Sequence, residues 1–301
     1  MKVRLSPFKV FDMFALIFLA LIFILFPVAS AKERPAVKSA TTTTIIVPQP
    51  KTSAAPAPEI TANSVYIFDP DSGTKIYEKN GRTKLFPAST TKLMTALVAL
   101  DAYDTDQVLT ARTASQAVGS TIHLVNGDQL TVENLLYGLL VDSGNDAGLV
   151  LAENYPGGYT QFITRMNQKV RELGLTSTHF TNVSGLINDD HYTTVTDLTV
   201  IARAAIRNAT IRKIVSTKTI TITDITGSKK YYLESTNKLL GMDGVKGLKT
   251  GWTPESGECL VTLVTRDGKS ILVTLLGSED RFGESAKLIN WVYDNFDWMQ
   301  I

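Results

Sequence analysis

The sequence has few of the residues that form crosslinks or bind metals. It contains one cysteine, Cys259, and three histidines among 301 residues. A single cysteine excludes an intramolecular disulfide and a multi-cysteine metal cluster, and no zinc-ligand spacing is present. Cys259 lies in the apolar run Cys259-Leu260-Val261, which predicts a small core residue rather than a reactive thiol. We therefore expect neither a metal nor a cofactor.

Strong charge of one sign is also absent. The formal net charge is +1 at pH 7, so the chain lacks the basic field that is typical of nucleic-acid-binding proteins. We expect no nucleic-acid partner. Hydrophobic residues make up 44% of the sequence and charged residues 20%, a composition that allows one substantial core with a smaller subdomain.

The N-terminus has the layout of an export signal. A basic start is followed by an apolar run at 13–26 and by Ala29-Ser30-Ala31. Residues 1–31 are predicted to be a signal peptide cleaved after Ala31 or, as the less favoured alternative, an uncleaved membrane anchor. Either reading places the rest of the chain outside the cytoplasm, in the cell envelope.

The remaining chain divides by composition and periodicity. Residues 32–62 are rich in Ala, Thr and Pro, which predicts a disordered linker. The catalytic domain is predicted at 63–301. Its two ends alternate like strands, at 64–79 and 220–276, whereas 90–216 has mainly helical spacing. The expected fold class is α+β: an antiparallel sheet formed by both ends of the domain and flanked by helices, with a helical subdomain inserted.

A serine and a lysine three residues apart begin one of the predicted helices. Ser89 follows a proline-led turn, and the apolar residues after Lys92 have helical spacing, so both side chains share a helix face. The helix dipole favours an anion near Ser89, which suits a nucleophile with a lysine base. The same Ser-x-x-Lys pattern at Ser6, Ser72 and Ser235 does not begin such a helix.

Two further motifs follow Ser89-x-x-Lys92 in order. They are Ser143-Gly144-Asn145, between two predicted helices, and Lys249-Thr250-Gly251, in a predicted strand. This combination is typical of penicillin-binding proteins and class A β-lactamases. Across about 63–295 the sequence resembles the D-alanyl-D-alanine carboxypeptidase family of low-molecular-mass penicillin-binding proteins. Longer segments that carry the resemblance are 87–96, 182–186, 191–194 and 247–251.

The resemblance implies a serine-based mechanism. Ser89 would attack the carbonyl between two terminal D-alanines and form an acyl-enzyme. Lys92 would accept the serine proton, for which it must be neutral, and burial together with the second cation Lys249 would lower its pKa. Ser143 would relay a proton to the leaving amine, and Asn145 would orient Lys92 and hold the substrate amide.

The same resemblance implies a substrate-binding strand. Lys249 and Thr250 would meet the substrate on an edge strand, and Gly251 would allow close backbone approach. The backbone N–H groups of the nucleophile and of Trp252 would form the oxyanion hole. Many family members have a histidine where this chain has Trp252, which leaves substrate preference open. Arg281, just before the last predicted helix, would bind the free carboxylate of the substrate.

The implied partners are peptidoglycan stem peptides that end in D-Ala-D-Ala, with β-lactams as covalent inhibitors. A D,D-endopeptidase of the same family is a close alternative. A β-lactamase is less favoured because no convincing Glu-x-x-x-Asn occurs between Ser143 and Lys249. The intact motifs argue against an inactive wall-binding module. His191 falls in a family motif but is interpreted as structural, and a Ser-His-Asp triad is not expected.

Overall fold

The computed structural model describes residues 45–301. The predicted signal or anchor at 1–31 and the first part of the predicted linker lie outside these residues. Among the helices of the described part, none is long and apolar enough to cross a membrane.

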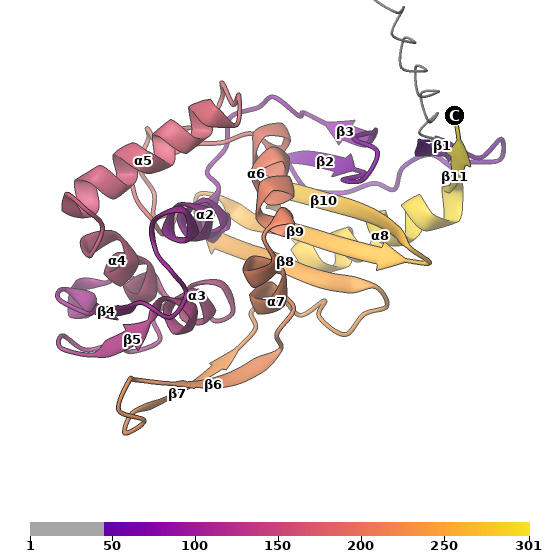
Figure 1. Ribbon diagram of the computed structural model, residues 1–301. Coiled ribbons are helices and arrows are strands. Elements are labelled where there is room, and N and C mark those ends of the chain that lie inside the picture. The colour runs from indigo at the N-terminus through magenta and orange to yellow at the C-terminus, as the bar shows by residue number, and fades with distance from the viewer. Residues whose placement is uncertain (1–44) are drawn as a thin grey trace, which may run out of the picture. The chain divides into compact units, whose positions relative to one another are not determined.

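The central element is an antiparallel sheet built from both ends of the domain. It has five strands in the order β3-β2-β10-β9-β8 (Figure 1). The N-terminal end supplies β2 (Ser64–Phe68) and β3 (Lys75–Lys79), and the C-terminal end supplies β8 (Val245–Thr253), β9 (Gly257–Arg266) and β10 (Lys269–Ser278). Leu272 of β10 pairs with Phe68 of β2, which joins the two ends directly. This arrangement confirms the predicted α+β sheet.

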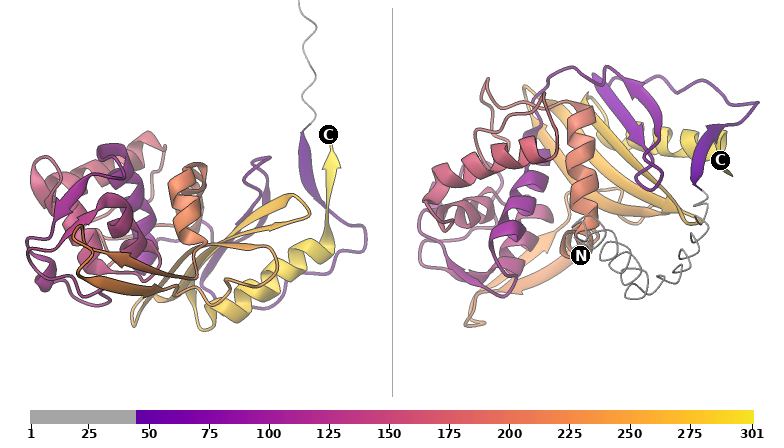
Figure 2. Two further views of the ribbon diagram at one scale, coloured as in Figure 1. Left: turned by 60° about the horizontal axis from the view of Figure 1, so that its bottom comes forward. Right: turned by 45° about the horizontal axis from the view of Figure 1, so that its top comes forward.

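Both faces of the sheet are covered by helices. Helix α8 (Arg281–Asn295) packs on β9 and β10 from one side, whereas α6 (Val195–Arg207) crosses β10 and β2 on the other, followed by α7 (Ala209–Val215) next to β8 (Figure 2). Because successive side chains of a strand point to opposite faces, the apolar run in β10 feeds two cores. Ile271, Val273 and Leu275 pack toward α8, and Leu272 and Leu276 pack toward the helical core.

The helical subdomain lies between the two sheet-forming ends in sequence, as predicted. Its helices are α2 (Lys92–Ala102), α3 (Val132–Leu140), α4 (Asn145–Glu153) and α5 (Gly158–Glu172), with a small hairpin of β4 (Val108–Thr110) and β5 (Gln129–Thr131). A second hairpin, β6 (Thr219–Thr223) and β7 (Lys230–Glu234), extends below it in Figure 1. The same part of the chain contains two 3₁₀ turns, η1 (Ala88–Thr91) and η2 (Ala114–Gln116).

Helix α2 differs from the amphipathic helix that its sequence predicts. Every residue from Lys92 to Ala99 is buried, because α3, α4, α5 and α6 all pack against it. The helix is therefore the central element of the helical core, and a polar side chain on its first eight residues has no direct access to bulk water.

The linker prediction is wrong for the part of it that the structure describes beyond residue 45. A strand, β1 (Ile46–Pro50), pairs with β11 (Phe296–Gln300) at the C-terminus. Val47 is buried in this pair, and the segment that follows is held by a hydrogen bond from Trp291 Nε1 to the Ala55 carbonyl. The Ala/Thr/Pro composition conceals this strand because, within the described residues, it pairs with β11 at the opposite end of the chain.

Candidate active site

Ser89 lies in the 3₁₀ turn η1, directly before helix α2. The turn is tightly enclosed: Ala88 has a positive φ of 46°, and its carbonyl lies where a Cβ of Gly185 would be. A residue other than glycine at 185 would overlap this carbonyl, and the φ of +85° there also favours glycine. The loop that contains Gly185 therefore fixes the backbone on which Ser89 sits.

Lys92 reaches back over one turn to Ser89. Its Nζ donates to Ser89 Oγ at 2.8 Å and also lies 3.3 Å from both Ser143 Oγ and the carbonyl oxygen of Ser184. The side chain is fully buried. The pattern of a helix-borne serine and lysine thus produces the hydrogen bond that a nucleophile and its base require.

Ser143 joins this centre from the loop between α3 and α4. Its φ is 64°, an unusual conformation for a residue with a side chain. A Cβ on the neighbouring Gly144 would lie 2.8 Å from Asp146 Oδ1 and 3.2 Å from the Gly138 carbonyl oxygen, so a larger residue would crowd the loop there. Asp146 holds the adjacent loop by accepting hydrogen bonds from the N–H groups of Ile122 and Leu124. The loop is therefore shaped to present the Ser143 hydroxyl to the lysines.

Lys249 enters from strand β8 on the opposite side. Its Nζ donates to Ser143 Oγ at 3.0 Å and to the Thr250 carbonyl at 3.0 Å. Ser143 Oγ consequently lies between the Nζ atoms of Lys92 and Lys249, although the two lysines are far apart in sequence. In residues 45–301, both ammonium groups have only hydroxyl and carbonyl oxygens as hydrogen-bond partners, and neither forms an ion pair.

This environment lowers the pKa of both lysines. Burial is the main cause of the lowered pKa of Lys92, and Lys249 adds to it, while Asp146 opposes it. Burial lowers the pKa of Lys249 to about 7, with a further contribution from Arg281. The predicted electrostatic coupling between Lys92 and Lys249 is therefore present, with burial as the larger effect. A neutral lysine next to Ser89 can accept its proton.

The rest of β8 passes close to Ser89. A Cβ on Gly251 would lie 3.0 Å from Ser89 N, so glycine permits this approach. Thr250 Oγ1 lies 2.6 Å from Thr236 Oγ1, and Trp252 is 58% exposed. Because β8 is an edge strand of the sheet, its outer side is available to an extended peptide.

Arg281 begins helix α8 and turns toward β8. Its Nη1 donates to the Gly251 carbonyl at 2.8 Å and lies 3.9 Å from Glu258 Oε1. Its buried Nε has no hydrogen-bond partner in the described part of the chain. Arg281 is therefore a partly buried cation beside the strand of Lys249, rather than a solvated surface arginine.

Asn145 departs from one expected role. Its amide nitrogen donates to the Val118 carbonyl, not toward Lys92, which is held instead by the Ser184 carbonyl. The Oδ1 atom of Asn145 is buried and lacks a hydrogen-bond partner within residues 45–301. Burying a polar atom without a partner is costly, so this oxygen is suited to accept a hydrogen bond from a ligand.

His191 and Cys259 behave as structural residues. His191 is buried, accepts the Thr181 N–H at Nδ1 and hydrogen-bonds Thr91 Oγ1 through Nε2. Burial lowers the pKa of His191 to about 4, which keeps the ring neutral. Cys259 is buried in β9, and burial raises the pKa of its thiol to about 11. Within residues 45–301, neither side chain hydrogen-bonds Ser89 or the two lysines.

Sequence reasoning missed three residues that complete the centre. They are Ser184, whose carbonyl accepts from Lys92, Thr236, which contacts Thr250, and Asp146, which holds the loop beside Ser143. The only sequence signal for Ser184 was the segment 182–186 in the family resemblance. Thr236 had none, because it acts from an irregular connection between β7 and β8.

Comparison with known proteins shows the family of this chain. The family model described as D-alanyl-D-alanine carboxypeptidase matches residues 50–280. The chain belongs to the D-alanyl-D-alanine carboxypeptidase family. It is 36% identical over 260 residues to the D-alanyl-D-alanine carboxypeptidase of Streptomyces sp. (strain K15), covering 79% of this chain and 89% of that protein. It is 32% identical to the carboxypeptidase DacF of Bacillus subtilis (strain 168), covering 78% of this chain but 63% of DacF.

Solved structures of the family have the same fold. The Streptomyces K15 DD-transpeptidase superposes with a TM-score of 0.76 at 36% identity, covering 80% of this chain and all of that chain (100%). An evolved penicillin-binding protein homologue from Mycobacterium tuberculosis gives a TM-score of 0.76 at 31% identity, covering 82% of this chain and 96% of that chain. The carboxypeptidase family therefore accounts for both the sheet and the inserted helical subdomain.

Proposed function

We propose that this chain is a serine-type D-Ala-D-Ala carboxypeptidase that removes the terminal D-alanine from peptidoglycan stem peptides. The observation that carries the proposal is the hydrogen bond of 2.8 Å between Ser89 Oγ and a fully buried lysine amine. The lowered pKa of Lys92 favours its neutral form, which is the form that can accept a proton. Named relatives in the family support this substrate class.

The proposed reaction has two steps. Ser89 Oγ attacks the carbonyl of the penultimate D-alanine while Lys92 takes its proton; Lys92 then returns this proton through Ser143 to the leaving amine, the C–N bond breaks, and D-alanine departs. Water next attacks the ester carbonyl while Lys92, neutral again, accepts a proton from it, and Lys92 passes this proton to Ser89 Oγ as the ester C–O bond breaks. The N–H groups of Ser89 and Trp252 stabilise the oxyanion in both steps.

The remaining residues of the centre bind the peptide. Asn145 Oδ1, which is buried without a partner in residues 45–301, accepts the N–H of the acyl-side amide. Lys249, Thr250 and Arg281 are directed to the terminal carboxylate, which a partly buried arginine suits. Gly251 lets the peptide lie close to β8. β-Lactams present a reactive carbonyl and a carboxylate in one molecule, so they acylate Ser89 by the same route.

The proposed place of action is the cell envelope, reached through the N-terminal segment 1–31. That segment lies outside the described residues, and cleavage or retention as an anchor is part of the proposal. Mass spectrometry of the N-terminus of the protein recovered from its native host distinguishes the two forms. A mature protein that starts at residue 32 supports cleavage.

The decisive experiment combines covalent labelling with product release. The purified protein is incubated with a fluorescent penicillin and, separately, with a peptide that ends in D-Ala-D-Ala, and the Ser89→Ala variant is the control. We expect labelling and D-alanine release from the wild type, and a loss of release by about 10⁴-fold or more in the variant. Equal labelling of both proteins would remove Ser89 as nucleophile, and labelling without D-alanine release would contradict carboxypeptidase activity.

A further inference from the structure

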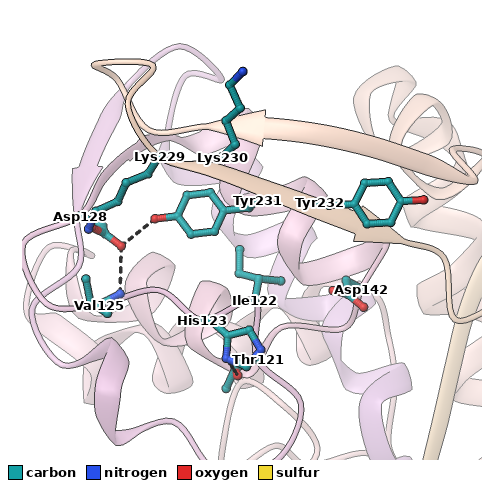
Figure 3. Close-up of a pocket in the computed structure, with 10 residues that line it drawn as sticks. All are labelled: Thr121, Ile122, His123, Val125, Asp128, Asp142, Lys229, Lys230, Tyr231 and Tyr232. Carbon is teal, nitrogen blue, oxygen red and sulfur yellow. Dashed lines mark hydrogen bonds and ion pairs between the residues drawn. The ribbon is translucent and has the colours of Figure 1, made fainter.

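A hollow lies under the β6–β7 hairpin, and Asp142, which precedes Ser143, forms part of its lining. This hairpin pocket has a volume of about 550 Å³ and is lined by 121–123, Val125, Asp128, Asp142 and 229–232 (Figure 3). The rings of Tyr231 and Tyr232 come from strand β7, and Asp142 comes from the loop that leads to Ser143. The pocket is therefore formed jointly by the hairpin and by the catalytic loop.

Most charges around the hairpin pocket are already compensated. Asp128 is nearly buried, pairs with Lys229 and accepts the Tyr231 hydroxyl at 2.7 Å. Lys230 points away from the pocket, as Figure 3 shows. His123 Nδ1 lies 3.4 Å from Thr121 Oγ1. The charge of Asp128 is therefore balanced by Lys229, and the Lys230 side chain does not extend into the pocket.

Asp142 is the exception. It is partly buried, and within residues 45–301 its carboxylate forms neither a hydrogen bond nor an ion pair. Burial and the neighbouring Asp146 raise its pKa, although His123 and Lys249 partly oppose this rise. A partly desolvated carboxylate without a donor is unfavourable in the free protein, and a cation placed against it would relieve that cost. The neighbouring aromatic rings and Ile122 offer apolar contact for a methylene chain that carries such a cation.

The position of Asp142 assigns the pocket to one side of the scissile bond. Asp142 precedes Ser143, the proposed proton donor to the leaving amine, and its charge acts on Lys249. Asn145, the proposed partner of the acyl-side amide, lines a different hollow of about 230 Å³ together with Ser184 and Leu186. The hairpin pocket is thus connected to the proposed proton donor through Asp142, whereas the smaller hollow contains Asn145, the proposed partner of the acyl-side amide.

We propose that the hairpin pocket is a leaving-group subsite in which Asp142 binds the ammonium group of a C-terminal D-residue with a cationic side chain. The inference rests on the proposed function, because it takes Ser89 as nucleophile and Ser143 as proton donor. The α-carboxylate of the leaving residue remains with Thr250 and Arg281, while its flexible side chain extends over Tyr231 and Tyr232. The enzyme then releases residues larger than D-alanine, and Asp142 determines which of them is preferred.

The test uses three peptides that differ only in the last residue: D-alanine, D-norleucine and D-lysine. Norleucine has the length of lysine without its charge, so the ratio of kcat/KM for D-lysine to that for D-norleucine isolates the ammonium. We expect a ratio of about ten in the wild type, the size of one charge-assisted hydrogen bond. Asp142→Asn should reduce the ratio to near one.

The ratio is insensitive to a general change at the catalytic centre. Any effect of Asp142→Asn that acts through Lys249 changes kcat/KM for both peptides by the same factor, so it cancels in the ratio. Glu234→Gln is the matched control, since it removes a nearby carboxylate that does not line the pocket and should keep the wild-type ratio. Labelling with a fluorescent penicillin shows that Ser89 is intact in each variant.

Three outcomes would overturn the subsite. One is a wild-type ratio near one, the second is a high ratio that persists in Asp142→Asn, and the third is an equal loss in Glu234→Gln. If the wild type releases D-alanine but shows no preference for D-lysine, this inference fails and the proposed function stands. If it releases no D-alanine, both fail.

Discussion

Lysines occur in two contrasting environments on either side of the Ser143 loop. Lys92 is fully buried, and its hydrogen-bond partners are hydroxyl and carbonyl oxygens. Lys229, in the hairpin pocket, is 49% exposed and pairs with Asp128, which is only 3% exposed. Burial without a carboxylate favours the neutral amine, whereas exposure with a carboxylate favours the ammonium. The first environment suits a proton acceptor, and the second suits a structural ion pair.

Lys249 extends this contrast. It is buried like Lys92, and Arg281 adds a positive charge to its surroundings. Two buried amines around one serine hydroxyl would be an expensive arrangement for stability alone. We therefore expect the two buried amines to serve the chemistry at Ser89, which can be tested by changing each lysine and its partner.

The largest effect is expected when Lys92 is replaced by arginine. A guanidinium stays charged at every accessible pH, so Lys92→Arg removes the base while it keeps the charge. The rate of acylation by a fluorescent penicillin should fall about 10³-fold. Lys229→Arg keeps its ion pair and should unfold at the wild-type temperature. Near-normal acylation by a folded Lys92→Arg protein, checked by circular dichroism, would contradict the role of Lys92 as base.

The next effect concerns the coupling between the two buried lysines. Lys249→Gln removes a cation that lowers the pKa of Lys92, so that pKa rises and the acidic limb of the acylation pH profile moves to higher pH. We expect acylation at saturating substrate to slow about 10²-fold near neutrality, in addition to weaker binding. Stopped-flow measurements of acylation at several pH values and substrate concentrations separate the slower acylation step from the weaker binding. An unchanged rate at saturation, with binding alone weakened, would refute the coupling.

A smaller effect, on the free energy of unfolding, is expected at the ion pair between Asp128 and Lys229. Burial by itself raises the pKa of Asp128, but the hydrogen bonds from Lys229, Val125 and Tyr231 lower it overall. Asp128→Asn should reduce the free energy of unfolding at pH 7 by about 1–3 kcal/mol, measured by urea denaturation. Because the folded pKa is the lower one, this stabilisation is present above the unfolded pKa and disappears as pH falls. Equal stability of both proteins at pH 7 would show that the pair is dispensable.

The pH dependence of stability should have the same sign at Lys249 as at Asp128, but in a higher pH window. Its folded pKa is about 7 and its ordinary value 10.5, so between these values the unfolded chain binds more protons. The free energy of unfolding therefore rises with pH in this window, by at most about 1.4 kcal/mol per unit for this group. Urea titrations at several pH values should show a shallower rise in Lys249→Met. Identical slopes would mean that Lys249 is charged in the folded protein.

Sequence patterns predicted the regular elements well where the periodicity was strong. The helical spacing predicted over 90–216 contains α6 (Val195–Arg207), and the strand-like alternation predicted over 220–276 contains β9 and most of β10. Thr194 caps α6 by accepting the Asp197 N–H, a signal that sequence carries locally. By contrast, β1 was missed because its pairing with β11 is nonlocal, and its side chains resemble those of a flexible linker.

The candidate site shows the same division. Motif order and resemblance led to Ser89, Lys92, Ser143 and Lys249, and the structure brings these four into one hydrogen-bonded centre. Asn145 was expected to orient Lys92, but its amide nitrogen donates to the Val118 carbonyl and Lys92 donates to the Ser184 carbonyl, contacts that depend on how distant loops pack. Ser184 accepts the hydrogen bond from Lys92 through its backbone carbonyl, so the type of its side chain does not predict this contact.

The sequence by itself determined the reactive groups, their order along the chain and the α+β fold class, because these depend on side-chain type and local periodicity. Only the tertiary structure decided the protonation of the two lysines. Burial of α2 on all sides and the approach of β8 to the Ser143 loop desolvate both amines and place them around one hydroxyl. Desolvation is a property of everything that surrounds a group, so no pattern of three or four residues can encode it.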